Sequence, residues 1–175
     1  MRNGLFLIFC LFLVTMYSAD IYAQTCKPAS IPASTPDSQL VDNGNGTIED
    51  TKTGLIWKKC VEGVTGYMCD SGNPLTFNWQ QALEQPGIVN SSGFAGYSDW
   101  RLPNIKELRS IVEEQCFGPA INLNRFPNTQ SWYFWSGSPN ASYSIYAWGV
   151  DFYNGYSGNG YRDSSLRVRL VRGGQ

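Results

Sequence analysis

The sequence predicts an α+β domain in which two short helices pack on an antiparallel sheet whose last strands are C-terminal. Two stretches, near residues 78 and 104, carry the residue pattern that begins a helix. After residue 130 the chain changes to alternating apolar and polar positions, which is typical of strands. Aromatic residues make up 14% of the chain, and this proportion favours a β-rich fold with an aromatic surface suited to binding.

Residues 1–23 have the order of a secretory signal peptide. Arg2 provides a positive start, the apolar run "LFLIFCLFLVTMY" follows, and Ala23 offers a small residue before a cut. A transmembrane anchor is the alternative, but the run is short for a span of about 20 residues. We therefore expect a secreted, cell-surface or periplasmic protein whose mature chain has no membrane span.

The remaining chain has about the length of one domain. A lead-in rich in proline and serine occupies residues 24–40, and the folded domain is expected over residues 41–175. "DNGNG" marks a turn at the start of this domain. "TIED" and "LIWKK" then predict two short strands joined by "TKTG".

The first helix is predicted over "FNWQQALEQP". Asn78 is its N-cap, and Gln81 stands three residues on as the reciprocal partner of a capping box. Pro86 and Gly87 are expected to end the helix. Its buried face is expected to carry three residues: Trp79, Ala82 and Leu83.

The second helix is predicted over "LPNIKELRSIVEEQC" by the same pattern, with Asn104 as the cap and Glu107 as the box partner. Its buried stripe is expected to consist of Ile105, Leu108, Ile111 and Val112. Arg101 precedes the helix. We expect it to pair with an acidic neighbour or to stack on an aromatic ring as a structural post, and a ligand-binding cation is the alternative.

Three strands are predicted after residue 130, over "SWYFWS", "YAWGVDF" and "LRVRLV". The second alternates between two faces: Trp148, Val150 and Phe152 against Ala147, Gly149 and Asp151. The third also alternates: Leu166, Val168 and Leu170 against Arg167 and Arg169. Asn154–Gly155 is the strongest short signal for a hairpin. Five tryptophans in periodic apolar contexts are expected in the core: Trp57, Trp79, Trp100, Trp135 and Trp148.

Four cysteines remain once Cys10 leaves with the signal peptide, and an even number in an exported chain suggests two disulfides. We pair Cys60 with Cys69, because they enclose a short glycine-containing loop, and this leaves Cys26 with Cys116. Three pairings are possible in principle. A four-thiolate zinc site is the other alternative, but the spacing contains no C-x2-C pair.

The composition excludes several functional classes. The net charge is −1 and no basic run exists, so nucleic acid and anionic membranes are poor partners. The chain has no histidine, which excludes Ser-His-Asp and Cys-His catalysis and histidine-ligated metals. No pair of carboxylates suits acid–base catalysis. "DNGNGTIED" is no EF-hand loop, since Gly44 and Gly46 replace oxygen ligands. We expect no enzyme, cofactor or metal, with calcium left open.

The segment from Ser136 to Leu166 contains no lysine and no glutamate, and its tyrosines are separated mainly by Ser, Asn, Gly and Asp. This composition is typical of binding surfaces, because tyrosine offers a large contact area at low entropic cost and the small residues adapt. An ordinary glycine-rich hairpin is the alternative. The expected ligand-binding residues are Asn140, Ser142, Tyr143, Ser144, Tyr146, Gly149, Tyr153, Tyr156, Asn159, Tyr161, Arg162 and Asp163.

Several stretches occur in an order that resembles the Lcl C-terminal domain family, named for the C-terminal domain of a bacterial collagen-like adhesin. They are "DNGNGTIEDTKTGLIWKKC", "FNWQQAL", "GFAGYSDWRLPNIKELRSIV", "INLNRFPNT", "YFWSGS", "YAWGVDF" and "VRLVRGGQ". The resemblance runs from about residue 40 to residue 175, and no collagen-like repeat is present. It implies a C-type-lectin-like fold, which formylglycine-generating enzymes and phage tropism determinants share. The enzyme branch uses cysteine and metal chemistry that four bridged cysteines would not offer.

Some members of this family resemble targets of diversity-generating retroelements, in which adenines of a template are miscopied into the C-terminal coding segment. An asparagine codon can then become Tyr, Ser, Asp, Gly or others. Residues that such changes could produce are Asn140, Ser142, Ser144, Tyr146, Gly149, Tyr153, Tyr156, Gly158, Asn159, Tyr161, Asp163 and Ser164. The framework "AW", "VDF" and "RLVRGGQ" would stay fixed.

Together these observations predict an exported binding protein whose C-terminal surface recognises a protein or carbohydrate ligand on another cell or surface. The alternative is a structural or adhesive component of the cell envelope without a diversified site.

Overall fold

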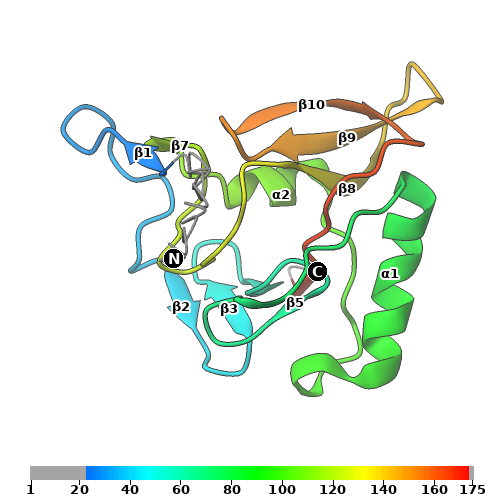
Figure 1. Ribbon diagram of the computed structural model, residues 1–175, viewed down its shortest axis with the longest axis horizontal. Helices are drawn as coiled ribbons and strands as arrows, with labels where there is room; N and C mark the ends of the chain where they lie inside the picture. Colours follow the sequence, from blue (N-terminus) through cyan, green and yellow to red (C-terminus); the bar gives the residue numbers. More distant parts are fainter. Residues whose placement is uncertain (1–22, 174–175) are drawn as a thin grey trace, which may run out of the picture.

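The computed structural model describes residues 23–173, and within them it confirms the predicted α+β class (Figure 1). The predicted signal peptide and its membrane-anchor alternative fall, except for Ala23, on residues 1–22, which lie outside the described part. Neither of the two described α-helices combines the length and the apolar composition needed to cross a membrane.

A four-stranded antiparallel sheet joins the beginning of the domain to its end (Figure 1). Its strands are β2 (Leu40–Asp42), β3 (Thr47–Asp50), β4 (Leu55–Lys58) and β11 (Val171–Gly173), in the order β11-β4-β3-β2. The predicted turn connects β2 to β3, with Gly44 and Gly46 at φ values of 72° and 86°. Such positive values favour glycine, which explains the "NGNG" sequence of this turn.

A three-stranded antiparallel sheet carries the tyrosine-rich segment. It consists of β8 (Tyr133–Pro139), β9 (Tyr146–Asp151) and β10 (Tyr156–Tyr161), in the order β10-β9-β8. β9 and β10 form the predicted hairpin, but four residues connect them rather than the two of an Asn-Gly turn, because Asp151 pairs with Tyr156. Gly155 closes this loop at a φ of 78°, and a Cβ there would lie 2.5 Å from Cγ1 of Val112.

Two further ladders are each closed by a disulfide. β1 (Thr25–Cys26) pairs with β7 (Cys116–Phe117), and Cys26 is bonded to Cys116. β5 (Val64–Thr65) pairs with β6 (Ser71–Gly72), next to the bond between Cys60 and Cys69. Both disulfides are the pairings that the sequence predicted. The first disulfide fastens the lead-in to the domain.

The first helix is longer than predicted. α1 spans Trp79–Ser92, and its N-terminus has the predicted capping box between Asn78 and Gln81. It continues through Pro86 and ends at Gly93, which takes the left-handed conformation. The sequence pattern placed the end too early because tertiary contacts hold the last turn: Asn90 exchanges two hydrogen bonds with the backbone of Trp100.

The buried face of α1 also differs from the prediction. Leu83 is 43% exposed, and the buried side chains are Ala82, Gln85 and Val89. Gln85 is buried because it donates to the carboxylate of Glu62 at 3.0 Å. A polar residue that finds such a partner can replace an apolar one in a core stripe.

The second helix is shorter than its pattern suggested. α2 spans Ile105–Ser110 and begins with the predicted capping box of Asn104 and Glu107. Ile111 and Val112 are buried as expected, but they lie beyond the helix end. Arg101 is the predicted structural post: its guanidinium donates to both carboxylate oxygens of Glu107 at 2.7 Å.

Two apolar clusters form the core. One surrounds α2, which packs beneath β8 and β9, and contains Trp57, Phe134 and Val150 (Figure 1). The other lies between α1 and β8 and contains Trp100 and Trp135. Trp79 and Trp148, which were expected in the core, are only half-buried. Strand β9 does not have the expected inside and outside faces, because Ala147 and Gly149 are buried as well as Val150.

The C-terminal segment corrects another prediction. Of the strand predicted over "LRVRLV", only Val171 is in a strand, β11 (Val171–Gly173), and the two alternating sets are not separated into a buried and an exposed face, because Arg167 and Arg169 are buried as well as Val168 and Leu170. Arg169 donates to the carbonyls of Lys58 and Lys59 and to the hydroxyl of Thr129. Burial lowers the pKa of its guanidinium to about 9. Arg169 is therefore an internal hydrogen-bond donor that connects this segment to residues 58, 59 and 129, and we call it the internal post.

Candidate ligand-binding surface

The tyrosine-rich segment forms an aromatic surface on β10 and on the loop between β8 and β9. We call this the tyrosine surface, and it consists of Tyr133, Tyr143, Ile145, Tyr146, Tyr156, Asn159 and Tyr161. The large apolar residues of the two cores are buried. In the tyrosine surface, by contrast, four side chains are more than half exposed: Tyr143, Ile145, Tyr156 and Tyr161. Clustered exposed apolar residues of this kind mark interaction sites.

Three rings of the tyrosine surface, those of Tyr143, Tyr146 and Tyr161, are packed against one another. Tyr146 and Tyr161 form a cross-strand pair, and their ring centroids are 4.6 Å apart. The ring of Tyr143 meets that of Tyr146 edge to face at 6.3 Å. A hydrogen bond with Tyr161 raises the pKa of the Tyr146 phenol above its usual value. The exposed rings are therefore held in a defined arrangement.

A hollow of about 710 Å³ lies within the tyrosine surface, bounded by Tyr133, Tyr143, Ile145, Tyr146, Tyr156, Gly158 and Asn159. Its floor is formed where Tyr133 lies over Gly158, and a Cβ at residue 158 would stand 2.6 Å from the phenol oxygen. Burial, together with the nearby carboxylate of Asp151, raises the pKa of Tyr133 to about 12. Tyr133 thus stays a neutral hydrogen-bonding group at ordinary pH.

Hydrogen bonds hold the loop that carries Tyr143 and Ile145. The side-chain oxygen of Asn140 accepts from the amides of Ser142 and Tyr143, and its amide group donates to Asn159 at 2.9 Å. The backbone of Arg162 donates to the carbonyl of Ile145. These contacts tie the loop to β10, so the surface is assembled within the chain itself.

The structure brings together six of the twelve expected binding residues: Asn140, Tyr143, Tyr146, Tyr156, Asn159 and Tyr161. Ser142 and Ser144 are exposed in the adjoining loop. Tyr153 lies apart in the β9–β10 loop, where its ring meets that of Phe117 at 6.5 Å. Gly149 does not reach the surface, because it is buried and a Cβ there would meet the carbonyl of Phe134.

Arg162 and Asp163 line a separate hollow of about 320 Å³ beside the N-terminus of α1. The guanidinium of Arg162 lies 4.3 Å from the ring of Trp79, and its Nε donates to the carbonyl of Tyr146. Arg162 therefore links α1 to the tyrosine surface and is not part of the 710 Å³ hollow.

Sequence reasoning missed two members of the tyrosine surface, Tyr133 and Ile145. Tyr133 lies in "SWYFWS", where its neighbours Phe134 and Trp135 are core residues. Ile145 is the only apolar aliphatic residue among the polar residues 140–146 apart from Ala141, and this contrast could have identified it. Tyr133 gave no such signal, because its place in the hollow depends on the glycines of β9 and β10.

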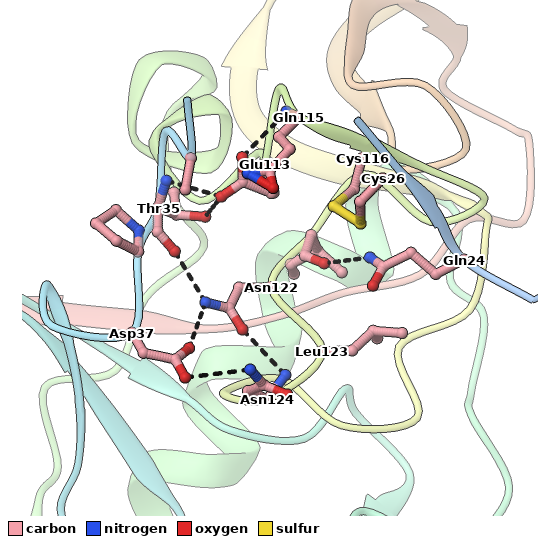
Figure 2. Close-up of a pocket in the computed structure, with 13 residues that line it drawn as sticks. Gln24, Cys26, Thr35, Asp37, Glu113, Gln115, Cys116, Asn122, Leu123 and Asn124 are labelled. Atoms are coloured by element: carbon pink, nitrogen blue, oxygen red, sulfur yellow. Dashed lines mark hydrogen bonds between the residues drawn. A yellow bond between two sulfur atoms is a disulfide. The ribbon is translucent and has the colours of Figure 1, made fainter. Parts of the chain in front are cut away.

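Figure 2 shows a different hollow, between the lead-in and residues 121–124. Its volume is about 310 Å³. The carboxylate of Glu113 accepts from the amide and hydroxyl of Thr35 at 2.9 and 2.8 Å. Asn122 donates to the carbonyl of Thr35 and to Asp37, and Asn124 also donates to Asp37. These polar groups form hydrogen bonds with one another, and these bonds hold the lead-in on the domain.

Titratable residues form no metal-binding cluster in the described part of the chain: no group of three His, Cys, Asp or Glu side chains is placed to hold an ion. Asp42, in the turn "DNGNG", is paired with Lys59 at 2.7 Å. Burial opposes ionisation of Asp42, but the hydrogen bonds from Lys59 and Gly44 outweigh it and lower the carboxyl pKa.

The fold and the surface together define a disulfide-linked α+β domain that presents a preassembled aromatic surface. Comparison with known families agrees with the resemblance seen in the sequence, since residues 46–172 match the Lcl C-terminal domain. The chain belongs to this family. A search of curated proteins finds no match. The C-type-lectin-like fold that the resemblance implies stays a prediction.

Proposed function

We propose that this protein is exported and binds a protein or carbohydrate ligand on another cell or surface through the tyrosine surface. The observation that carries this proposal is the 710 Å³ hollow, which is lined by two exposed tyrosines, Tyr143 and Tyr156, and by two half-buried ones. Tyrosine rings supply apolar contact area, and their hydroxyls supply hydrogen bonds. An assembled surface loses little entropy on binding, and this favours affinity.

The charge distribution supports recognition by stacking and neutral hydrogen bonds. Among residues 23–173, the hollow is lined by tyrosines, Ile145, Gly158 and Asn159, none of which carries a charged side chain. Sugars present apolar faces and hydroxyl groups, and protein surfaces present side chains and amides. Both can be contacted by such a surface, so the ligand class has to be decided by experiment.

The two disulfides support a location outside the cytoplasm, because such bonds persist in oxidising compartments. Export through a cleaved signal at residues 1–23 is part of the proposal. Mass spectrometry of the purified protein tests it: we expect a mature N-terminus close to Gln24 and no free thiol. An intact N-terminus would leave the membrane-anchor alternative as the better account.

Diversification by a retroelement is a further candidate for the same surface. It is supported by the exposure of Ser142, Ser144, Tyr156 and Tyr161, where side chains can vary without touching the core. Gly149 and Gly158 do not fit, because a larger residue at either would collide with Tyr133. A reverse transcriptase gene beside this one, with a near-copy of its 3′ end differing at adenines, is the expected finding. Neither feature would be present in a structural or adhesive envelope component without a diversified site.

The proposal is tested with an array of glycans and purified bacterial and host surface proteins. The unaltered chain is compared with a triple variant that replaces Tyr143, Tyr146 and Tyr156 by alanine. We expect at least one array component to bind the unaltered chain and not the variant. Tyr153→Ala is the matched control, because its exposed ring lies outside the hollow. Equal binding by the folded triple variant would refute the proposal.

A further inference from the structure

Strand β10 forms one edge of the three-stranded sheet, and no strand of residues 23–173 lies beyond it (Figure 1). The direction of its backbone groups follows from the hydrogen bonds. The amide of Arg162 donates to the carbonyl of Ile145, and antiparallel pairs alternate between hydrogen-bonded and non-bonded positions. The backbone N–H and C=O groups of Ser157, Asn159 and Tyr161 therefore point away from β9.

The opposite edge of the same sheet is covered. Along β8, the amide of Trp135 donates to the carbonyl of Arg167, and the amide of Arg167 donates to the carbonyl of Tyr133. The register of β8 against β9 is also interrupted between Trp135 and Pro139. Segment 166–168 and this irregularity protect the β8 edge from pairing with another chain.

β10 has none of these protections. All six of its residues, "YSGNGY", pair with β9 in continuous register, and none is charged or a proline. Within residues 23–173, one hydrogen bond reaches the backbone groups of β10 that point away from β9: the amide of Ser164 donates to the carbonyl of Tyr161. A carbonyl oxygen can accept a second bond. An unprotected edge strand of this kind is a template for pairing.

We infer that β10 pairs with β10 of a second copy of this chain, in antiparallel direction about a two-fold axis at Asn159. The outward-pointing residues are spaced symmetrically around Asn159, so that each finds a hydrogen-bonding position opposite. Ser157 would pair with Tyr161 of the second copy, and Asn159 with Asn159. A two-fold interface uses the same patch on both copies, and antiparallel pairing of β10 with itself has this property.

The side chains that this register brings together are compatible. Gly158 lies opposite Gly160 of the second copy, which leaves the backbones free to approach. Tyr156 lies opposite Arg162 of the second copy, and an aromatic ring beside a guanidinium is a favourable pair. No like charges oppose each other. The occupant is therefore a second copy, and the paired sheet would place the tyrosine surfaces of two chains side by side.

The measurement is the mass in solution, by light scattering during size-exclusion chromatography, of the chain expressed with its whole sequence and purified after any processing. An interface made by one strand from each copy is small, so the protein is studied at its highest soluble concentration. We expect the mass of two chains. A single-chain mass at all concentrations would overturn the inference.

The two-fold axis allows a sharper test, because one substitution at Asn159 places two identical charges directly opposite each other. We expect Asn159→Lys and Asn159→Asp each to be monomeric, and an equal mixture of the two to form a dimer of one chain of each kind. Ser91→Lys, on the exposed far end of α1, is the control for added charge and should remain dimeric.

Two results would contradict the register. If Asn159→Lys stays dimeric, another surface makes the dimer. If both variants are monomeric but their mixture stays monomeric too, residue 159 does not face itself. Circular dichroism and the urea midpoint of each variant show whether it is folded. The result does not depend on ligand binding, so it stands or falls separately from the proposed function.

Discussion

Two adjoining segments of the chain differ in what their side chains do. Residues 140–163 place tyrosines in solvent and hold them with hydrogen bonds among loop residues. Residues 166–171 bury even their arginines, and the guanidinium of Arg169 binds backbone carbonyls of the neighbouring strand. Residue type alone therefore does not decide which segment lies at the surface and which lies in the core. Partners available in the fold decide it.

The largest expected effect lies in the buried segment. Arg169→Met removes the donor that serves the carbonyls of Lys58 and Lys59 and the hydroxyl of Thr129. Leaving a buried acceptor without its donor typically costs about 1 to 3 kcal/mol, and three acceptors lose a donor here. We expect a loss of this size in the free energy of unfolding, measured by urea denaturation. Arg172→Met is the control, since Arg172 pairs with the exposed Asp99. Similar losses in both would show that Arg169 is not the internal post described above.

The disulfides come next, because they hold the lead-in and one loop to the domain. Replacing Cys26 and Cys116 by serine opens a link across 90 residues, whereas replacing Cys60 and Cys69 opens one across 9. Loss of a native disulfide typically costs about 2 to 5 kcal/mol, and more for longer loops. We expect the first pair to cost more in urea unfolding. The reverse order would indicate that the lead-in contributes little to folding.

Gly149 lies inside the tyrosine-rich segment but behaves as a framework position. A side chain there meets Tyr133 at 2.6 Å and the carbonyl of Phe134. Overpacking of this kind costs about 1 to 3 kcal/mol, so Gly149→Ser should lower stability by that amount. Ser144→Tyr, in the exposed loop, is the matched enlargement and should leave the urea midpoint unchanged. Equal tolerance at both positions would remove the distinction between the two segments.

Acid sensitivity should arise from the lead-in rather than from the tyrosine surface. Burial tends to raise the pKa of Glu113, but hydrogen bonds from the amides of Ser34, Thr35 and Gln115 outweigh it and lower the pKa below 4.5. A lowered folded-state pKa stabilises the fold above pH 4.5, and this contribution is lost as the pH falls through the folded value. Thermal melts from pH 7 to pH 3 should therefore fall less steeply in Glu113→Gln than in the unaltered chain. Parallel curves would contradict this role.

The smallest effect on stability is expected at the tyrosine surface. Tyr156 is 66% exposed and its ring has solvent on one side, so Tyr156→Ala should change the free energy of unfolding by about 0.5 kcal/mol or less. Urea denaturation measures this change. A loss comparable to that of Gly149→Ser would mean that the exposed rings support the fold, which would weaken the case for a binding role.

Sequence patterns predicted correctly those structural features that depend on residues close together in the chain. Both capping boxes were predicted because their partners lie three residues apart. The hairpin near Gly155 and the aromatic surface were predicted in the same way, from turn residues and composition. The prediction failed where distant residues decide the outcome. Pro86 stays helical because Trp100 holds the last turn, and Arg167 and Arg169 are buried because carbonyls and side chains from other segments receive them.

The same limit applies to the site. The sequence indicated Asn140, Tyr143 and Tyr156, but it could not show that Gly149 lies beneath the ring of Tyr133. It also could not show that Tyr153 lies apart from the hollow, since Tyr153 and Tyr156 belong to the same tyrosine-rich stretch and only Tyr156 lines the hollow. Positions within a strand share a surface only when register and neighbours allow it.

The most direct test of the central claim is the affinity of three proteins for the array component that binds the unaltered chain most tightly. The proteins are the unaltered chain, Tyr156→Ala and Tyr153→Ala, and the measurement is an equilibrium titration. Tyr156→Ala is predicted to bind about tenfold more weakly or worse, which corresponds to about 1.4 kcal/mol, while Tyr153→Ala keeps the full affinity. Equal affinities for all three proteins would contradict the assignment of the tyrosine surface as the binding site.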